Sequence, residues 1–178
     1  MKALTIRQPW ATLIVMGIKN IENRSWKTNY RGELLIHAGK AKDPYAMQAG
    51  ERLCRKYGLP FPEELPLGCY VGLVTLSGLV NMENRQVQSD ITDLDMNNLR
   101  GYIYEDFGFV LTNPRSMPTI PANGRLGLFN PEEEILAQVR QYFEENRIYP
   151  SNPVITIPEI KTEKKRTMFR MGPKKTTP

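Results

Sequence analysis

The sequence predicts an α+β fold in which a barrel-like mixed sheet is flanked by about three helices. Three observations carry this prediction: short strand patterns mix with helical ones, the sequence shows no internal repeat, and its apolar residues suffice for one core. At 178 residues the chain is long enough for one well-packed domain and short for two. We expect one domain over residues 1–150, followed by a basic, flexible tail over residues 151–178.

The first elements are a strand over residues 2–7 and a short helix over residues 9–16. Pro9 suits the first turn of this helix and Gly17 its end. Nearly every residue of the helix is apolar, so we expect it to be buried on most sides, plugging or crossing the barrel.

The middle of the chain predicts a strand over residues 31–38 and a helix from Pro44 to about Tyr57. Asp43 can cap this helix, and Gly58 can close it. A long strand or bent strand pair should follow over residues 69–82, where two glycines mark bends or bulges, Gly72 and Gly78.

The last third of the domain predicts a strand over residues 107–111, a long proline-containing surface loop, and a final short strand ending near Phe129. A helix over residues 131–147 should close the domain. We expect a capping box at its start, formed by Asn130, Pro131 and Glu133, and a buried stripe of Ile135, Leu136, Val139 and Phe143. Residues 83–105 are polar and weakly patterned, and we predict no element there.

Composition narrows the function classes. The net charge of +5 lies in residues 151–178, which leaves the body formally neutral. The chain has one histidine, His37, so it cannot supply a clustered His/Cys zinc site, and we expect no cofactor and no metal. Cys54 and Cys69 are predicted to be reduced core residues. The sequence has no apolar run long enough to cross a bilayer and no secretory signal, so we expect a cytoplasmic protein without a membrane partner.

One segment carries a specific motif. Residues 17–26 read GIKNIENRSW and match GxKxxExR from Gly17 to Arg24. The flanking stretches LTIRQPWATLIVMG and RGELLIHAGK, and the later GFVLTNPRSMPTIPANGRLGLF, occur in the matching order. Over roughly residues 3–130 the chain thus resembles the ASCH domain family of the PUA-like superfamily. The resemblance implies a barrel of five or six strands flanked by helices, and an association with RNA or with transcription coactivators.

The motif also makes chemical sense from its residues alone. If residues 22–26 are extended, the two-residue period of a strand puts Glu22, Arg24 and Trp26 on one face. Trp26 can stack on a nucleobase or cover the edge of the barrel, Arg24 can grip a phosphate or a base edge, and Glu22 can accept from an exocyclic amine. Lys19 can point into the same cleft. The alternative is that Lys19, Glu22 and Arg24 form a ladder of solvent-exposed salt bridges. Judged by the spacing of these charges alone, such a ladder is the more common arrangement.

Further residues lie where they could complete a pocket. Gln8 and Arg7 flank the buried helix, whereas Trp10 within that helix is better explained as core. His37 can face the interior or the cleft, and a lone histidine is more often structural. Five residues in or beside loops could close over a ligand: Tyr102, Tyr104, Asn113, Asn123 and Arg125.

The leading hypothesis is a domain that binds RNA, a nucleotide or a modified base, with Gln8, Lys19, Glu22, Arg24 and Trp26 at the site. One alternative is a hydrolase that acts on an acylated nucleoside, or a ribonuclease, with Lys19 and Glu22 as catalytic residues. Amidohydrolase-like relatives carry a threonine three residues after the motif lysine, where this chain has Glu22. A nearby carboxylate favours the charged lysine, which opposes nucleophilic work. Another alternative is a scaffold that contacts nucleic acid only through the basic tail, residues 161–175.

Overall fold

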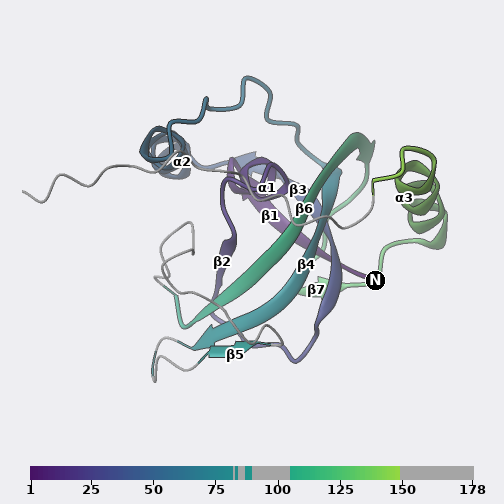
Figure 1. The fold of residues 1–178 in the computed structure, drawn as a ribbon, viewed down its shortest axis with the longest axis horizontal. Helices are drawn as coiled ribbons and strands as arrows, with labels where there is room; N and C mark the ends of the chain where they lie inside the picture. Colours follow the sequence, from purple (N-terminus) through teal and green to yellow (C-terminus); the bar gives the residue numbers. More distant parts are fainter. Residues whose placement is uncertain (82, 84–86, 90–104, 149–178) are drawn as a thin grey trace, which may run out of the picture.

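In the computed structural model of the chain, one mixed sheet curls around a short helix while two longer helices lie on opposite flanks (Figure 1). The structure describes residues 1–81, 83, 87–89 and 105–148. The elements, in chain order, are β1 (Lys2–Gln8), α1 (Trp10–Val15), β2 (Ile21–Arg24), β3 (Gly32–Lys42), α2 (Pro44–Lys56), β4 (Cys69–Asn81), β5 (Val87–Ser89), β6 (Phe107–Pro121), β7 (Leu128–Phe129) and α3 (Glu133–Glu145).

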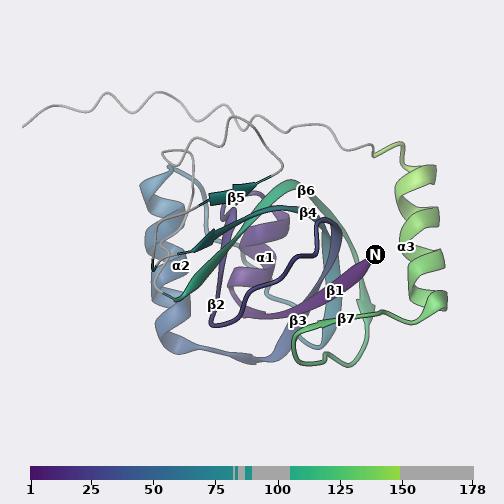
Figure 2. The same ribbon diagram turned by 90° about the horizontal axis from the view of Figure 1, so that it is seen from below.

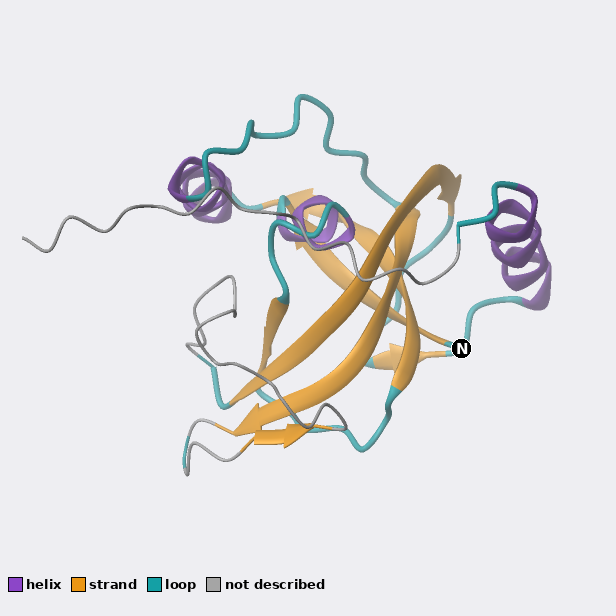
Figure 3. Ribbon diagram, viewed as in Figure 1, coloured by secondary structure: helices purple, strands orange, loops and turns teal. Residues whose placement is uncertain are grey.

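The sheet forms a half-barrel. Its strands follow the order β2-β6-β4-β3-β1-β7, and β5 pairs with β4 beside this path. β1 and β3 are parallel, whereas the other pairs are antiparallel. The long strands β4 and β6 curve strongly, which brings β2 round to face β1 (Figure 3). The predicted α+β class, with a barrel-like mixed sheet and three helices, is confirmed.

Helix α1 lies in the hollow of the curled sheet (Figure 2) and contacts β1, β3, β4 and β6. Four of its six residues are buried, namely Ala11, Leu13, Ile14 and Val15. An apolar helix of this kind removes its whole circumference from water only if strands surround it. The sequence-based prediction of a buried helix within the barrel is therefore confirmed.

Helix α2 begins as its sequence predicts. The Asp43 carboxylate accepts hydrogen bonds from the backbone N–H groups of Tyr45 and Ala46 at 2.9 and 3.2 Å, and Pro44 occupies the first turn. The helix buries a stripe of Ala46, Gly50, Leu53 and Cys54. Cys54 and Cys69 are both buried free thiols, as expected.

The bends of β4 also agree with the sequence. The pairing of β4 with β6 shifts register between Tyr70 and Gly72 and again between Leu76 and Gly78. An added Cβ on Gly72 would collide with the Arg115 carbonyl oxygen of β6. The backbones of the two strands therefore approach closely at this bulge, which only glycine permits.

Strand β6 corrects the prediction of a long loop after Leu111. The strand continues to Pro121, because its prolines lie where they disturb the sheet least. Pro114 and Pro118 fall at irregularities of the β4–β6 pairing. β2 pairs with the other edge of β6 only from Phe107 to Val110, so the later prolines, which lack an N–H group, interrupt no ladder on that side.

The start of α3 corrects the predicted capping box. The helix begins at Glu133, its N-cap is Glu132, and no side chain caps it. The Asn130 carboxamide oxygen instead accepts a hydrogen bond from the Lys2 ammonium at 2.8 Å. The predicted stripe is present: Leu136, Val139 and Phe143 are buried, and Ile135 packs against them partly exposed.

Several predictions fall on other parts of the chain. Tyr102, Tyr104 and the tail over residues 151–178 lie outside the described residues. Strand β5 forms within the polar stretch for which no element was predicted. Across the described ranges, no helix combines the length and apolar character needed to cross a membrane.

Candidate functional site

A cavity of about 850 Å³ lies at the seam where the sheet stays open. β7 pairs with β1 only at Ala3 and Leu4, so the edge of β1 beyond Leu4 faces β2 across this seam. The walls come from β1, α1, β2, β3, α2, Glu105 and the loop before β7. The lining residues are Thr5, Arg7, Trp10, Glu22, Asn23, Arg24, His37, Gly39, Lys40, Asp43, Ala46, Glu105, Asn123, Gly124, Arg125, Leu126 and Gly127.

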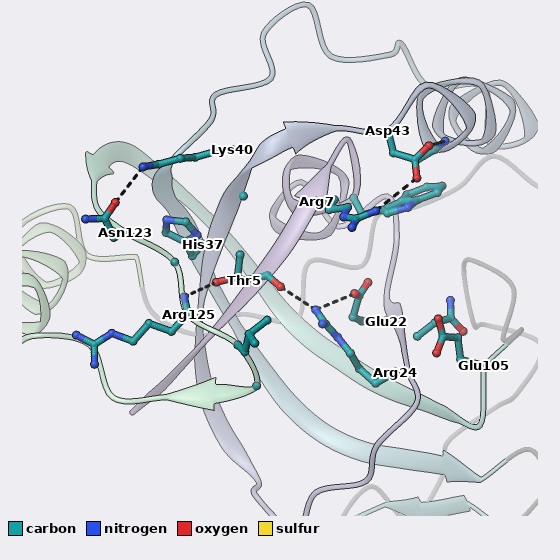
Figure 4. A pocket seen from close by; sticks show the side chains of 17 residues that line it. Thr5, Arg7, Glu22, Arg24, His37, Lys40, Asp43, Glu105, Asn123 and Arg125 are labelled. Atoms are coloured by element: carbon teal, nitrogen blue, oxygen red, sulfur yellow. Dashed lines mark hydrogen bonds and ion pairs between the residues drawn. The ribbon is translucent and has the colours of Figure 1, made fainter.

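The charged residues of the motif form a continuous chain of contacts. The Lys19 ammonium donates to Glu22 Oε2 at 2.8 Å and also to the Ile21 carbonyl oxygen. The Arg24 guanidinium contacts Glu22 Oε1 at 3.2 Å and donates to the Thr5 carbonyl oxygen at 2.9 Å (Figure 4). Because Arg24 lies on β2 and Thr5 on β1, this chain ties the two strands together across the seam.

Lys19 and Glu22 are buried, with exposed fractions of 4% and 7%. Burial lowers the pKa of Lys19 from its ordinary value, and the charge and hydrogen bond of Glu22 oppose that shift. Glu22 reaches the cavity wall, whereas Lys19 lies behind it and does not line the cavity. The lysine therefore supports the carboxylate from inside the protein.

The predicted site residues separate into two groups. Glu22 and Arg24 line the cavity, but Gln8, Lys19 and Trp26 do not. Gln8 is fully buried and holds the start of α1: its amide donates to Thr12 Oγ1 and to the Pro66 carbonyl oxygen, both at 2.8 Å, and its oxygen accepts from the Thr12 N–H. The expectation of direct ligand contact therefore rests on Glu22 and Arg24.

The two tryptophans differ in their relation to the cavity. β2 ends at Arg24, so the two-residue alternation stops before Trp26, whose ring packs edge-on against Phe109 at a centroid distance of 5.1 Å. Trp10, predicted as core, packs partly buried against the core and also lines the cavity, and the Lys19 ammonium lies 5.4 Å from its ring centroid. The aromatic surface of the site therefore belongs to α1.

His37 is both buried and part of the cavity wall. Its Nε2 lies 3.1 Å from the Ala122 carbonyl oxygen. A carbonyl can only accept, so Nε2 carries the proton and Nδ1 has the lone pair in the neutral ring. Among the described residues Nδ1 has no hydrogen-bond partner. The ring thus anchors the start of the loop that covers the cavity.

The loop over residues 123–127 forms the outer wall. The Lys40 ammonium donates to Asn123 Oδ1 at 3.0 Å, and the Arg125 N–H donates to Thr5 Oγ1 at 3.1 Å. Asn123 and Arg125 therefore lie beside the cavity, as the sequence suggested. Asn113 does not: its backbone is left-handed with φ 49°, and its amide donates to Thr75.

Sequence reasoning missed Lys40 and Asp43 as lining residues. Lys40 lies near the end of β3, the strand that pairs with β1, and Asp43 follows β3 as the N-cap of α2. The only signal was their position at a junction between strand and helix. Asp43 also contacts the exposed Arg7 at 3.9 Å across the cavity mouth. In the part of the chain that the structure describes, no cluster of three or more His, Cys, Asp or Glu is placed to hold a metal ion.

The environment of His37 leads to a pH-dependent prediction. Burial lowers the pKa of His37 from its ordinary value of 6.5, and the charge of Lys40 acts in the same direction. The folded protein then binds fewer protons than the unfolded chain, so stability should fall as the pH drops from about 7 toward 5.5. A proton NMR titration tests this directly, because the chain has a single histidine. A midpoint at or above 6.5 would contradict it.

A half-barrel that carries the GxKxxExR segment at its open seam defines the chain as an ASCH domain protein. The model of the ASCH domain family matches residues 4–115, and the chain belongs to this family. Two curated relatives are similar to it: Activating signal cointegrator 1 of Mus musculus, 36% identical over 118 residues, and its namesake in Homo sapiens, 34% identical over 119 residues. Each match covers 64% of this chain but 19% of the relative, so the chain corresponds to about a fifth of those proteins.

Two solved structures of mutant forms of ZmASCH from Zymomonas mobilis are also similar. Each is 13% identical to this chain and superposes with a TM-score of 0.45. The matches cover 78% and 79% of this chain, and 96% and 94% of the solved chains.

Proposed function

We propose that the seam cavity binds single-stranded RNA or a nucleotide. The observation that carries the proposal is a single cavity whose inner wall holds Glu22 and Arg24 while three exposed cations border it, namely Arg7, Lys40 and Arg125. A volume of about 850 Å³ falls within the roughly 300–1,000 Å³ of ordinary ligand pockets. That space suits one nucleotide, with room for the neighbouring backbone.

The two ends of a nucleotide match the two parts of the cavity. Arginine and lysine side chains make charge-assisted hydrogen bonds to phosphate, so the exposed cations favour the backbone. The polar inner wall and the face of Trp10 suit a base, because proteins recognise unpaired RNA bases by stacking and by contacts to their edges. The resemblance to the ASCH family, which implies an association with RNA, supports the same ligand.

The geometry supports binding better than hydrolysis. A catalytic lysine must reach the substrate, and Lys19 lies behind Glu22, outside the cavity wall. Although burial lowers the pKa of Lys19, its 2.8 Å contact with Glu22 holds the nitrogen inside the protein, on the far side of the carboxylate from the cavity. Sustained turnover of an acylated nucleoside or of labelled RNA, lost in Lys19→Ala, would favour the hydrolase instead.

Paired charge removals test the proposal. Arg7→Ala with Lys40→Ala removes two cations at the cavity, and Arg55→Ala with Lys56→Ala removes the same two residue types from the exposed end of α2. In fluorescence anisotropy with a short single-stranded RNA, the cavity variant should bind about tenfold more weakly, a difference of about 1.4 kcal/mol. Its salt slope should fall by about 1.4, at about 0.7 per lost phosphate contact. The α2 variant should bind as the native chain does.

Two results would argue against the cavity. Equal losses in both variants would show that net charge alone governs the affinity. Unchanged binding in both would place the contact elsewhere, and the tail over residues 161–175 would then be the first segment to test. Both variants retain the tail, so its contribution cancels in the comparison.

A further inference from the structure

Glu22 presents a fixed, acceptor-only group to the cavity. Its Oε2 accepts from Lys19 at 2.8 Å, and its Oε1 lies 3.2 Å from the Arg24 guanidinium. A carboxylate only accepts hydrogen bonds, because it has no proton to donate. A carboxylate offers about four lone-pair positions, and these contacts use one on each oxygen.

The position of Glu22 is also rigid. Its side chain is 9% exposed, β2 supports its backbone through pairing with Phe109 of β6, and Lys19 and Arg24 hold its two oxygens from different directions. The remaining lone pairs that face the cavity therefore cannot turn away when an unsuitable ligand enters. When a ligand places an acceptor against a buried acceptor, the protein group loses its hydrogen bond to water and gains none in return, which costs binding free energy.

The edges of the RNA bases differ in what they offer to such a group. Cytosine, adenine and guanine carry an exocyclic amine, which donates to a carboxylate. Uracil presents keto oxygens on both sides of its single ring N–H, and these oxygens would face the carboxylate. The discrimination is strong, because a hydrogen bond to a charged group is worth more than a neutral one.

On the basis of the proposed function, we infer that Glu22 makes the cavity selective for nucleotides whose base carries an exocyclic amine, over uridine nucleotides. The exposed cations bind the phosphate of either kind equally. The difference in affinity between the two kinds of nucleotide therefore comes from the base edge that faces Glu22. Arg24 and Lys19 act as positioning residues for this carboxylate.

A ligand series on the native full-length chain tests the inference without any mutation. The series comprises cytidine monophosphate, uridine monophosphate and the monophosphate of pyrimidin-2-one riboside, which is cytidine without its amine. Calorimetric titration should show cytidine monophosphate binding at least tenfold more tightly than the other two. The third compound lacks the amine donor and adds no bulk. A loss of affinity for this compound therefore measures the hydrogen bond and not a steric clash.

The matching protein variant combines Lys19→Met with Glu22→Gln, which keeps the interior free of an unpaired charge. A carboxamide both donates and accepts, so the preference for cytidine over uridine monophosphate should shrink to less than about threefold. Glu51→Gln is the control, because Glu51 is an exposed carboxylate of α2 that does not line the cavity. It should keep the native preference. If the double variant fails to fold, the ligand series still decides.

The outcomes separate this inference from the proposed function. Equal affinity for all three compounds overturns the selectivity and leaves nucleotide binding in place. A native preference that survives in the folded double variant assigns the selectivity to another residue and overturns the role of Glu22. No binding of any compound, together with no binding of single-stranded RNA, overturns both proposals.

Discussion

Glu22→Ala is expected to lower the free energy of unfolding by about 3–5 kcal/mol, the range for breaking a buried ion pair from one side. The variant leaves the Lys19 ammonium at 4% exposure without its carboxylate, and water cannot replace the lost contact there. It also removes the Glu22 contact that holds the Arg24 guanidinium, whose other bond links β2 to β1. Urea unfolding followed by circular dichroism measures the change.

Two further variants test whether the loss of stability comes from the burial of this ion pair. Glu132→Ala breaks the ion pair with Arg125, whose side chains are 60% and 56% exposed, and should cost less than about 1 kcal/mol. Lys19→Met combined with Glu22→Leu removes the Lys19 charge together with its partner and should recover the part of the loss that comes from Lys19, because apolar replacement of a buried pair is often neutral. Arg24 keeps its hydrogen bond to the Thr5 carbonyl oxygen in this variant. A loss below about 1 kcal/mol for Glu22→Ala would show that Lys19 finds water or another partner.

The motif therefore has a structural role beside its proposed functional one. The sequence left two interpretations open for Lys19, Glu22 and Arg24: a solvated ladder of salt bridges, or a cleft. The structure shows a third arrangement, in which Lys19 is buried, Glu22 forms the wall, and Arg24 bridges the seam. One short segment thus connects the integrity of the half-barrel to the shape of its cavity.

Local patterns predicted those elements whose sequence signals agree with their surroundings. The cap at Asp43 and the bulges near Gly72 and Gly78 follow from backbone requirements that act within a few residues. The apolar helix over residues 9–16 was predictable because burial on all sides leaves no polar face. Signals of this kind do not depend on which strand lies beside them.

The features that were not predicted depend on how strands far apart in the sequence pair. Pro114, Pro118 and Pro121 predicted a loop, yet β6 continues past the first two and ends at the third, because the pairing at Pro114 and Pro118 is irregular and the far edge of β6 is open there. The position of Trp26 against Phe109 has a similar origin, since the end of β2 at Arg24 is fixed by where β6 stops pairing with it. The cavity draws on strands, helices and a loop far apart in sequence, so its full lining was not predictable from any one segment.

Gly124→Ala is expected to destabilise the protein by about 1–3 kcal/mol, the usual cost of overpacking, and to weaken nucleotide binding at the seam. A Cβ on Gly124 would lie 2.6 Å from Thr5 Oγ1 and 2.7 Å from Cε1 and Nδ1 of His37. His37 is 1% exposed and cannot retreat into the core, so the loop must move outward. That movement would strain the hydrogen bonds from Arg125 to Thr5 and from His37 to Ala122.

Gly39→Ala supplies the matched control, because Gly39 lines the same cavity and receives the same added methyl group. Its Cβ would lie 3.5 Å from Thr5 Cγ2 and 3.6 Å from the Ile6 carbonyl oxygen, which are ordinary contact distances. Thermal unfolding and RNA titration should therefore place Gly39→Ala near the native chain and Gly124→Ala well below it. If the two variants behaved alike, the close packing of the loop on Thr5 and His37 would have no part in shaping the site.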